Sequence, residues 1–251
     1  MHDPDEGVTP DGMIRTGARP RTYAPEHQGV FERVARDLPA GASLYVYGSV
    51  ATGTATIPAS DIDLVTFGVP AAVANELSRI HSTAAADVCR EVAIGPADRA
   101  GLQGVDAESY GNRVFLRHYC VHLTGPPVHE DVPDAFPANR AAARGFNGDI
   151  ARHAAAWKTA IESSNPAPAI LGTRIARKTL LAAAGLVSIR DQTWTTDRHR
   201  AARAWSSEDP EIGTLLEWLT DPPHQAAQVA DALDGLVARV VEAFEEQIGL
   251  W

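Results

Sequence analysis

The sequence has very few cysteines and no long apolar segment. Only Cys89 and Cys120 occur among its 251 residues, and their spacing follows no disulfide pattern. No stretch approaches the ~18 consecutive apolar residues of a membrane span, and the first residues lack the apolar core of a signal peptide. These absences predict a cytoplasmic protein with no disulfide framework and no membrane partner.

Basic residues are also scarce. The chain holds 22 lysines and arginines against 32 acidic residues, and only Lys158 and Lys178 are lysines. Proteins that follow a nucleic-acid backbone need a basic surface, so this balance argues against a nucleic-acid partner. Residues 41–135 carry eleven acids and five arginines, which favours attraction of a small cationic molecule.

Composition divides the chain into three parts. Residues 1–22 mix charges with proline and glycine and show no periodicity, which predicts a disordered leader. Four prolines crowd residues 126–137 and indicate a domain boundary. We therefore expect one domain over residues 23–138 and a second over residues 139–251.

The first of these domains combines strand and helix patterns. Apolar or alternating runs predict strands, and these lie at residues 43–47, 61–67, 88–94 and 113–123. Apolar residues at helical spacing predict two helices that begin at Pro25 and Ala71. The second domain is rich in alanine and predicts helices at residues 140–163, 169–186, 196–205, 211–218 and 224–248. The expected class is α+β, with an N-terminal mixed-sheet domain followed by an all-α helical bundle.

The strand predicted at residues 43–47 ends in Gly48-Ser49. Glycine lets the backbone turn sharply and approach a phosphate oxygen, and Ser49 offers a hydroxyl and backbone N–H groups. Ser60 lies just before the next predicted strand and supplies another hydroxyl. These three residues are candidates for binding the phosphates of a nucleotide.

Asp61 and Asp63 stand two residues apart on a predicted strand, so their side chains share one face. Mg²⁺ prefers oxygen ligands and usually takes one or two carboxylates together with substrate phosphates. We therefore expect both aspartates to be catalytic residues that hold the metal ion.

Glu91 is a charged residue within an apolar predicted strand. We expect a neighbouring strand to bring it near Asp61 and Asp63, as the general base for an acceptor hydroxyl or as a third metal ligand. Two aspartates already suffice for the metal, which favours the base. Asp87 is the competing base, and the alternative for Glu91 is a surface residue paired with Arg90.

Together these motifs resemble the pattern of the nucleotidyltransferase superfamily, namely Gly48-Ser49, eleven residues, Asp61-Ile62-Asp63, and Glu91 on a later strand. Within that superfamily the chain is most similar to the aminoglycoside adenylyltransferases, which carry a C-terminal helical domain. Residues 123–133 are similar to the stretch that joins their two domains. Residues 173–178, Gly185 and residues 196–197 resemble their C-terminal helix pair.

The resemblance implies transfer of AMP from ATP, with Mg²⁺ as cofactor on Asp61 and Asp63. The implied acceptor is a hydroxyl of a small cationic molecule such as an aminoglycoside, and the implied role is antibiotic resistance. An alternative within the superfamily is a toxin–antitoxin-like enzyme that modifies a protein or tRNA, although the overall acidity disfavours tRNA. An inactive nucleotide-binding scaffold is a third interpretation, which the complete carboxylate set argues against.

The resemblance also implies a basic residue of the helical domain that closes over the triphosphate, and Arg177 matches that position. Independently, Arg174, Arg177 and Lys178 share one face of a predicted helix, which suits a phosphate clamp. Related enzymes have a further basic residue after the next turn. This chain has Asp197-Arg198 there, so Arg198 is the weaker candidate.

Overall fold

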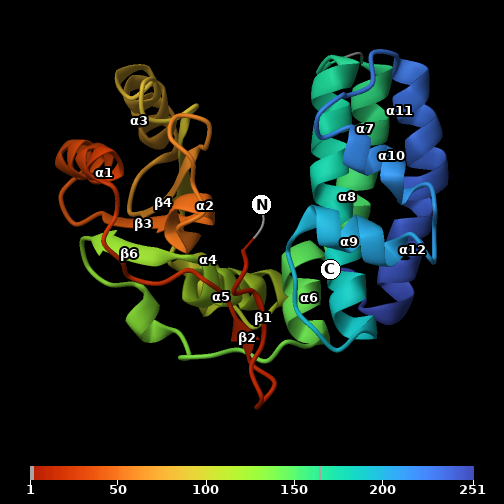
Figure 1. Ribbon diagram of the computed structural model, residues 1–251, viewed down its shortest axis with the longest axis horizontal. Helices are drawn as coiled ribbons and strands as arrows, with labels where there is room; N and C mark the ends of the chain where they lie inside the picture. The colour runs from red at the N-terminus through yellow and green to blue at the C-terminus, as the bar shows by residue number, and fades with distance from the viewer. Residues whose placement is uncertain (1–2, 164) are drawn as a thin grey trace. The chain divides into compact units, whose positions relative to one another are not determined.

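The computed structural model of the chain describes residues 3–163 and 165–251 (Figure 1). It consists of two compact units, each built from several segments. Among the described residues, unit 1 holds residues 3–6, Ile14–Val105 and Asn112–Phe136, and unit 2 holds Gly7–Met13, Asp106–Gly111 and the described part of residues 137–251. The division into domains at residues 138 and 139 stays a prediction.

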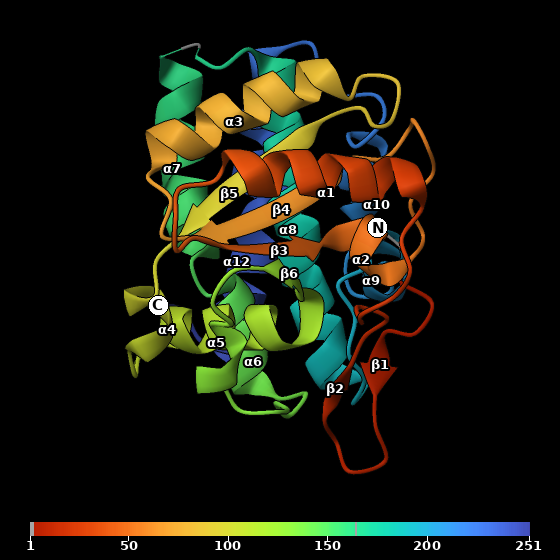
Figure 2. The ribbon, with the colours of Figure 1, turned by 90° about the vertical axis from the view of Figure 1, so that its left-hand side faces the viewer.

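Unit 1 is built on a four-stranded sheet in the order β5-β4-β3-β6 (Figure 2). Its strands are β3 (Ser43–Tyr47), β4 (Ile62–Phe67), β5 (Val92–Ala97) and β6 (Val121–Thr124). β3 pairs antiparallel with both β4 and β6, whereas β4 and β5 run parallel. The predicted mixed sheet is confirmed, and β3 has the predicted bounds.

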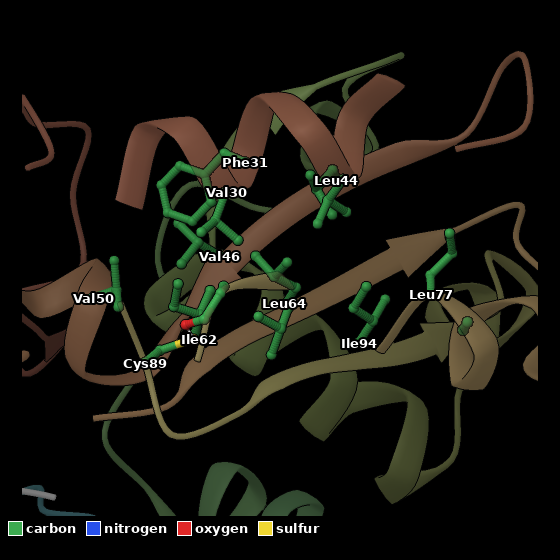
Figure 3. Packing of buried hydrophobic residues seen from close by; sticks show 14 of the residues in the cluster. Val30, Phe31, Leu44, Val46, Val50, Ile62, Leu64, Leu77, Cys89 and Ile94 are labelled. Carbon is green, nitrogen blue, oxygen red and sulfur yellow. Dashed lines mark hydrogen bonds between the residues drawn. The ribbon is translucent and has the colours of Figure 1, made fainter. Parts of the chain in front are cut away.

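Helices α1 (Pro25–Asp37) and α3 (Ala71–Ala84) cover one face of the sheet (Figure 2). α1 begins at Pro25 as predicted, because the fixed φ of proline suits the first turn of a helix. Phe31 of α1 and Leu64 of β4 belong to the hydrophobic core beneath these helices (Figure 3). Side chains of a strand alternate between its two faces, so β4 presents Asp63 on the face opposite α1 and α3.

The remaining elements of unit 1 are short, apart from one helix. α2 (Gly48–Thr52) follows β3 directly, α4 (Ala100–Gln103) follows β5, and His129–Asp131 form a 3₁₀ turn. α5 (Ala107–Tyr119) belongs to unit 2 up to Gly111 and to unit 1 from Asn112 onward.

The strand predicted at residues 113–123 is wrong over most of its length, because α5 extends to Tyr119 and only β6 is a strand. Val114 and Leu116 are both buried, and their alternation imitates the pattern of a strand. Periodicity alone does not separate a short buried strand from a buried helical segment.

β5 begins later than the run at residues 88–94 predicts. The N–H groups of Val88 and Cys89 donate to the carbonyl of Ala85 at 2.9 and 3.0 Å, so a turn precedes the strand. Both side chains are buried in that turn, which explains the strand-like apolar run. Glu91 therefore lies immediately before β5 rather than in its middle.

Residues 3–22 differ from the expected disordered leader. β1 (Gly7–Val8) and β2 (Ile14–Arg15) are short strands, and Ile14 is buried. The N–H of Gly17 donates to the carboxylate of Asp3 at 2.7 Å. Bonds from polar side chains to the backbone order such a segment without the apolar periodicity from which order is predicted.

Unit 2 contains a largely helical region, which confirms the helical second half. Its α-helices are α6 (Arg140–Asn147), α7 (Ile150–Glu162), α8 (Pro168–Arg190), α9 (Arg198–Trp205), α10 (Ile212–Glu217), α11 (Ala226–Ala232) and α12 (Ala238–Gln247). Leu233–Val237 form a π-helical turn before α12. All of residues 182–188 are buried, so α8 is the central helix of this unit. Within residues 3–163 and 165–251, no helix is both long and apolar enough to cross a membrane.

The fold of unit 1 holds His118 of α5 in its neutral form. Its Nε2 accepts a hydrogen bond from the N–H of Phe136 at 2.9 Å, which a protonated imidazole cannot do. Burial, and then the neighbouring Arg117 charge, lower the pKa of His118 to about 4. The pKa of histidine in an unfolded chain is about 6.5. His118 therefore contributes stability that is complete above this pH and is lost as the pH falls toward 4.

We predict that lowering the pH from 7 toward 4.5 reduces the free energy of unfolding, with about 1–2 kcal/mol of the fall due to His118. Urea unfolding of the wild type and of His118→Gln across this range measures the effect, because glutamine accepts the same bond without titrating. His224→Gln, at an exposed histidine, is the control. Equal pH slopes for the wild type and His118→Gln would contradict the prediction.

Candidate active site

Asp61 and Asp63 lie at the start of β4. Asp63 lies within the strand, and Asp61 comes directly before its first residue, Ile62. Both aspartates are half-buried, whereas Ile62 and Leu64 are buried. This alternation places both carboxylates on the face opposite α1 and α3. The pleat of one strand therefore brings the two aspartates together.

Gly48-Ser49 lie beside these carboxylates. β3 and β4 are antiparallel, and Tyr47 at the end of β3 pairs with Asp63. The chain then turns away at Gly48, whose φ of +72° lies in the left-handed region that glycine adopts without strain. The carbonyl of the buried Ser49 accepts the N–H of Thr54 at 2.9 Å, which closes the loop after α2.

Glu91 reaches the same end of the sheet from the neighbouring strand. β4 and β5 are parallel with Ile62 beside Val92, so Glu91 falls beside Asp61. The N–H of Ile62 donates to the carbonyl of Glu91 at 2.9 Å and fixes the two segments at this point. Val92 is buried whereas Glu91 is exposed, as expected for neighbours that point to opposite sides. Asp61, Asp63 and Glu91 thus lie at the same end of β4 and β5.

Ser60 and Asp87 lie at the edges of this group. The hydroxyl of Ser60 accepts the N–H of Thr56 at 2.9 Å, and the N–H of Ser60 donates to the carbonyl of Thr56 at 2.8 Å. Ser60 therefore closes the loop that leads into β4, and its contact with a phosphate stays a prediction. Asp87 is an exposed residue of the turn before Val88.

Arg90 pairs with Asp61 and not with Glu91, the partner expected if Glu91 were only a surface residue. Its guanidinium donates two hydrogen bonds to Asp61, from Nε to Oδ1 at 2.9 Å and from a terminal nitrogen to Oδ2 at 2.5 Å. These bonds and the charge of Asp61 raise the pKa of Arg90, and the charges of Glu91 and Asp63 add to the effect. A positive charge is therefore already accommodated among the three carboxylates.

Tyr47 belongs to the site although the motifs do not mark it. Its ring meets Phe115 of α5 edge-to-face, with 5.1 Å between the ring centroids. Burial, and then the negative charge of Asp63, raise the pKa of Tyr47, so its phenol stays protonated at neutral pH. Its one signal in the sequence is an aromatic residue directly before Gly48-Ser49. It forms an aromatic wall beside Asp63.

The residues of this face suit a magnesium ion that arrives with a nucleotide. Mg²⁺ takes one or two carboxylates plus phosphate oxygens, and Asp61 and Asp63 offer two carboxylates from one face. The guanidinium of Arg90 on Asp61 shows that this carboxylate pairs with a cation. In the described part of the chain, no group of three or more His, Cys, Asp or Glu side chains is placed to hold a metal ion by itself.

The basic candidates of unit 2 lie on α8 and α9. Arg174 and Arg177 are exposed on α8, and Arg198 donates from its Nε to the carbonyl of Arg177 at 3.1 Å. Burial, and then the charge of Arg177, lower the pKa of Arg198. Two guanidinium groups thus lie close together, as an anion-binding surface requires.

Lys178 has a structural partner within unit 2. Its Nζ lies 2.6 Å from Oδ1 of Asp149, which precedes α7, and donates to the carbonyl of Phe146 on α6 at 3.1 Å. These contacts fix α8 to the junction of α6 and α7. Binding of a nucleotide by Lys178 stays a prediction.

Known proteins resemble the chain at two levels. Residues 28–95, which include Gly48-Ser49 and all three carboxylates, match the family model described as the nucleotidyltransferase domain. Among solved structures, the chain is similar to spectinomycin adenyltransferase AAD(9) from Enterococcus faecialis, determined with ATP and spectinomycin. The TM-score is 0.53, with 9% identity over 88% of this chain and 98% of that chain. None of the curated proteins matches the sequence.

The matched segment runs from within α1 into β5 and contains most of the core under α1 and α3. At 9% identity the likeness to the adenyltransferase establishes the fold, a mixed four-stranded sheet followed by a helical region. The family match covers the loop and the carboxylates that would carry the chemistry. Residues 28–95 of the chain therefore match the nucleotidyltransferase domain, and the chain shares its fold with an adenyltransferase.

Proposed function

We propose that the protein transfers AMP from ATP to a hydroxyl of a small cationic acceptor such as an aminoglycoside. The proposal is supported by the strand register that sets Asp61, Asp63 and Glu91 at one end of β4 and β5, next to Gly48-Ser49, in a segment that matches the nucleotidyltransferase domain. The acidity of residues 41–135 supports a cationic acceptor. The fold of an adenyltransferase solved with ATP and spectinomycin supports the choice of both substrates.

In the proposed reaction, the acceptor oxygen attacks the α-phosphorus of ATP in line with the leaving group. The new oxygen–phosphorus bond forms as the bond from the α-phosphorus to the bridging oxygen breaks, and pyrophosphate leaves. Glu91 takes the proton of the acceptor hydroxyl, and its exposed position leaves room for an acceptor.

The remaining residues would bind and orient the triphosphate. Asp61 and Asp63 would hold Mg²⁺, which when bound neutralises charge on the phosphates and on the departing pyrophosphate. Gly48-Ser49 would contact phosphate oxygens, because the turn at Gly48 brings the backbone next to Asp63. Glu91 as a third ligand is the alternative to its role as base.

Arg177 is our candidate for a charge-assisted contact with the triphosphate. It is exposed, and Arg198 beside it adds a second positive charge that draws an anion to this surface. Lys178 would have a different role from Arg177, because its ammonium group already forms an ion pair with Asp149. We assign Lys178 the support of α8, with phosphate contact as the alternative.

The acceptor class is tested by measuring pyrophosphate release from ATP and Mg²⁺ with a panel of acceptors. We expect release with an aminoglycoside or spectinomycin and no release with tRNA or with proteins. An Asp63→Asn enzyme is the negative control for each acceptor. Release with tRNA or a protein alone would replace the proposed acceptor with the toxin–antitoxin-like alternative.

Removal of the proposed base gives a second prediction. Glu91→Gln should lower kcat by roughly 100-fold or more and leave the Kd for ATP within about threefold, because a general base acts in the transition state. Single-turnover kinetics and equilibrium ATP binding measure the two quantities. Asp87→Asn is the matched control and should keep kcat. If Asp87→Asn were inactive and Glu91→Gln active, the base would be Asp87.

The clamp assignment gives a third prediction. Arg177→Gln should raise the KM for ATP roughly tenfold or more, the usual effect of losing a charge-assisted hydrogen bond to phosphate. Arg174→Gln, one turn earlier on the same helix, is the control and should change KM little. Steady-state kinetics at saturating acceptor provide the measurement. If both variants raised the KM for ATP equally, the effect would come from the overall positive charge of the helix and not from a specific contact of Arg177.

A further inference from the structure

We propose that Arg90 is a positioning residue whose guanidinium occupies Asp61 in the nucleotide-free enzyme and must leave when a divalent metal binds. The metal would then bind weakly alone and tightly together with a nucleotide. This inference rests on the proposed metal site at Asp61 and Asp63 and assigns a role to a residue outside the motif.

The contact uses both oxygens of Asp61. Nε of Arg90 donates to Oδ1 at 2.9 Å, and a terminal nitrogen donates to Oδ2 at 2.5 Å. A metal ion on Asp61 needs one of these oxygens, so metal and guanidinium compete for the same carboxylate. Bidentate pairs of this kind also hold the carboxylate in one orientation.

The guanidinium of Arg90 can move away from Asp61, whereas the backbone of Arg90 is held in place. The side chain of Arg90 is 65% exposed and that of Asp61 is 24% exposed. The backbone N–H of Arg90 donates to the carbonyl of Ser60 at 3.2 Å, and the N–H of Ile62 donates to the carbonyl of Glu91 at 2.9 Å. These two bonds bracket Asp61, so a released guanidinium stays close to the carboxylates.

Charge explains why release would depend on the nucleotide. Asp61, Asp63 and Glu91 place three negative charges around Arg90, and the guanidinium offsets part of their mutual repulsion. A metal ion alone takes Asp61 from Arg90 and gives the guanidinium no new partner. A metal bound to ATP brings phosphate oxygens, which accept the same donors. The pair therefore opposes the bare metal more than the metal–nucleotide complex.

The test is Mn²⁺ binding to the full-length protein, followed by electron paramagnetic resonance without turnover. Ion pairs at this exposure shift a competing equilibrium by a few fold, so Arg90→Gln should lower the Kd for Mn²⁺ roughly threefold without nucleotide. Arg90→Lys, which keeps the charge but not the two-bond geometry, should fall between Arg90→Gln and the wild type. With an ATP analogue that cannot be cleaved at the α-phosphate, the advantage of Arg90→Gln should disappear.

Arg79→Gln is the matched control, because Arg79 makes a similar exposed two-bond pair with Glu76 away from the site. It should leave Mn²⁺ binding unchanged. Circular dichroism verifies that every variant is folded.

Asp61→Asn separates the inference from the proposed function. If Asp61→Asn abolishes Mn²⁺ binding while Arg90→Gln leaves the affinity unchanged, the role of Arg90 is wrong and the metal site stands. If Asp61→Asn binds Mn²⁺ like the wild type, Asp61 is not a ligand and both proposals fall. Equal tightening by Arg90→Gln with and without the nucleotide analogue would overturn the dependence on nucleotide.

Discussion

The antiparallel pairing of β3 with β4 is the constraint on which the site depends. It sets Tyr47 opposite Asp63, so the chain leaves the sheet at Gly48 beside a carboxylate. A shift of one residue would turn Asp63 into the core and Leu64 out of it. Burial of Leu64 against α1 and α3 therefore determines where the polar residues lie.

The parallel pairing of β4 with β5 adds the third carboxylate and an electrostatic cost. Asp61, Asp63 and Glu91 repel one another when all are ionised, and a fully buried group of this kind would take up protons instead. Two features reduce the repulsion among these carboxylates. Glu91 is exposed and both aspartates are half-buried at the end of their strand, and Arg90 supplies a counter-charge to Asp61. The end of the sheet thus already holds a cation, the guanidinium of Arg90.

The sequence predicted those parts of the fold in which local pattern and tertiary role agree. β3 is an apolar run that ends at a glycine, and α1 opens with a proline, so both were placed correctly. Residues 113–119 of α5 fall within the strand predicted at residues 113–123, because the buried Val114 and Leu116 alternate as in a strand, and only packing shows which period is used. The run at residues 88–94 predicts too early a start for β5, because Val88 and Cys89 are buried in a turn rather than in a strand.

The candidate site divides in the same way. The positions of Gly48, Asp61 and Asp63 follow from their spacing along two neighbouring strands, and this spacing can be counted in the sequence. The partners of Arg90 and Lys178 do not, because a long side chain can reach several acids. Arg90 pairs with Asp61, 29 residues away, rather than with the adjacent Glu91. Lys178 pairs with Asp149 instead of remaining on a free basic face. The tertiary structure determines these ion-pair partners, and residue spacing in the sequence does not predict them.

In the proposed reaction, recognition of the acceptor would also depend on residues that lie outside the motif. The face that carries Asp63 continues along β4 to Val65 and Phe67, which line a cavity of about 260 Å³ in unit 1. Its other walls come from segments around α4 and α5, and Asp98 is its one acidic residue. In the proposed reaction, a cavity this apolar would recognise the shape of an acceptor, and the acidity of the wider unit would attract its charge. The carboxylates are fixed by strand register and the walls by helices that follow no motif. At 9% identity the likeness to the adenyltransferase is one of fold, and a shared fold does not determine which side chains line these walls.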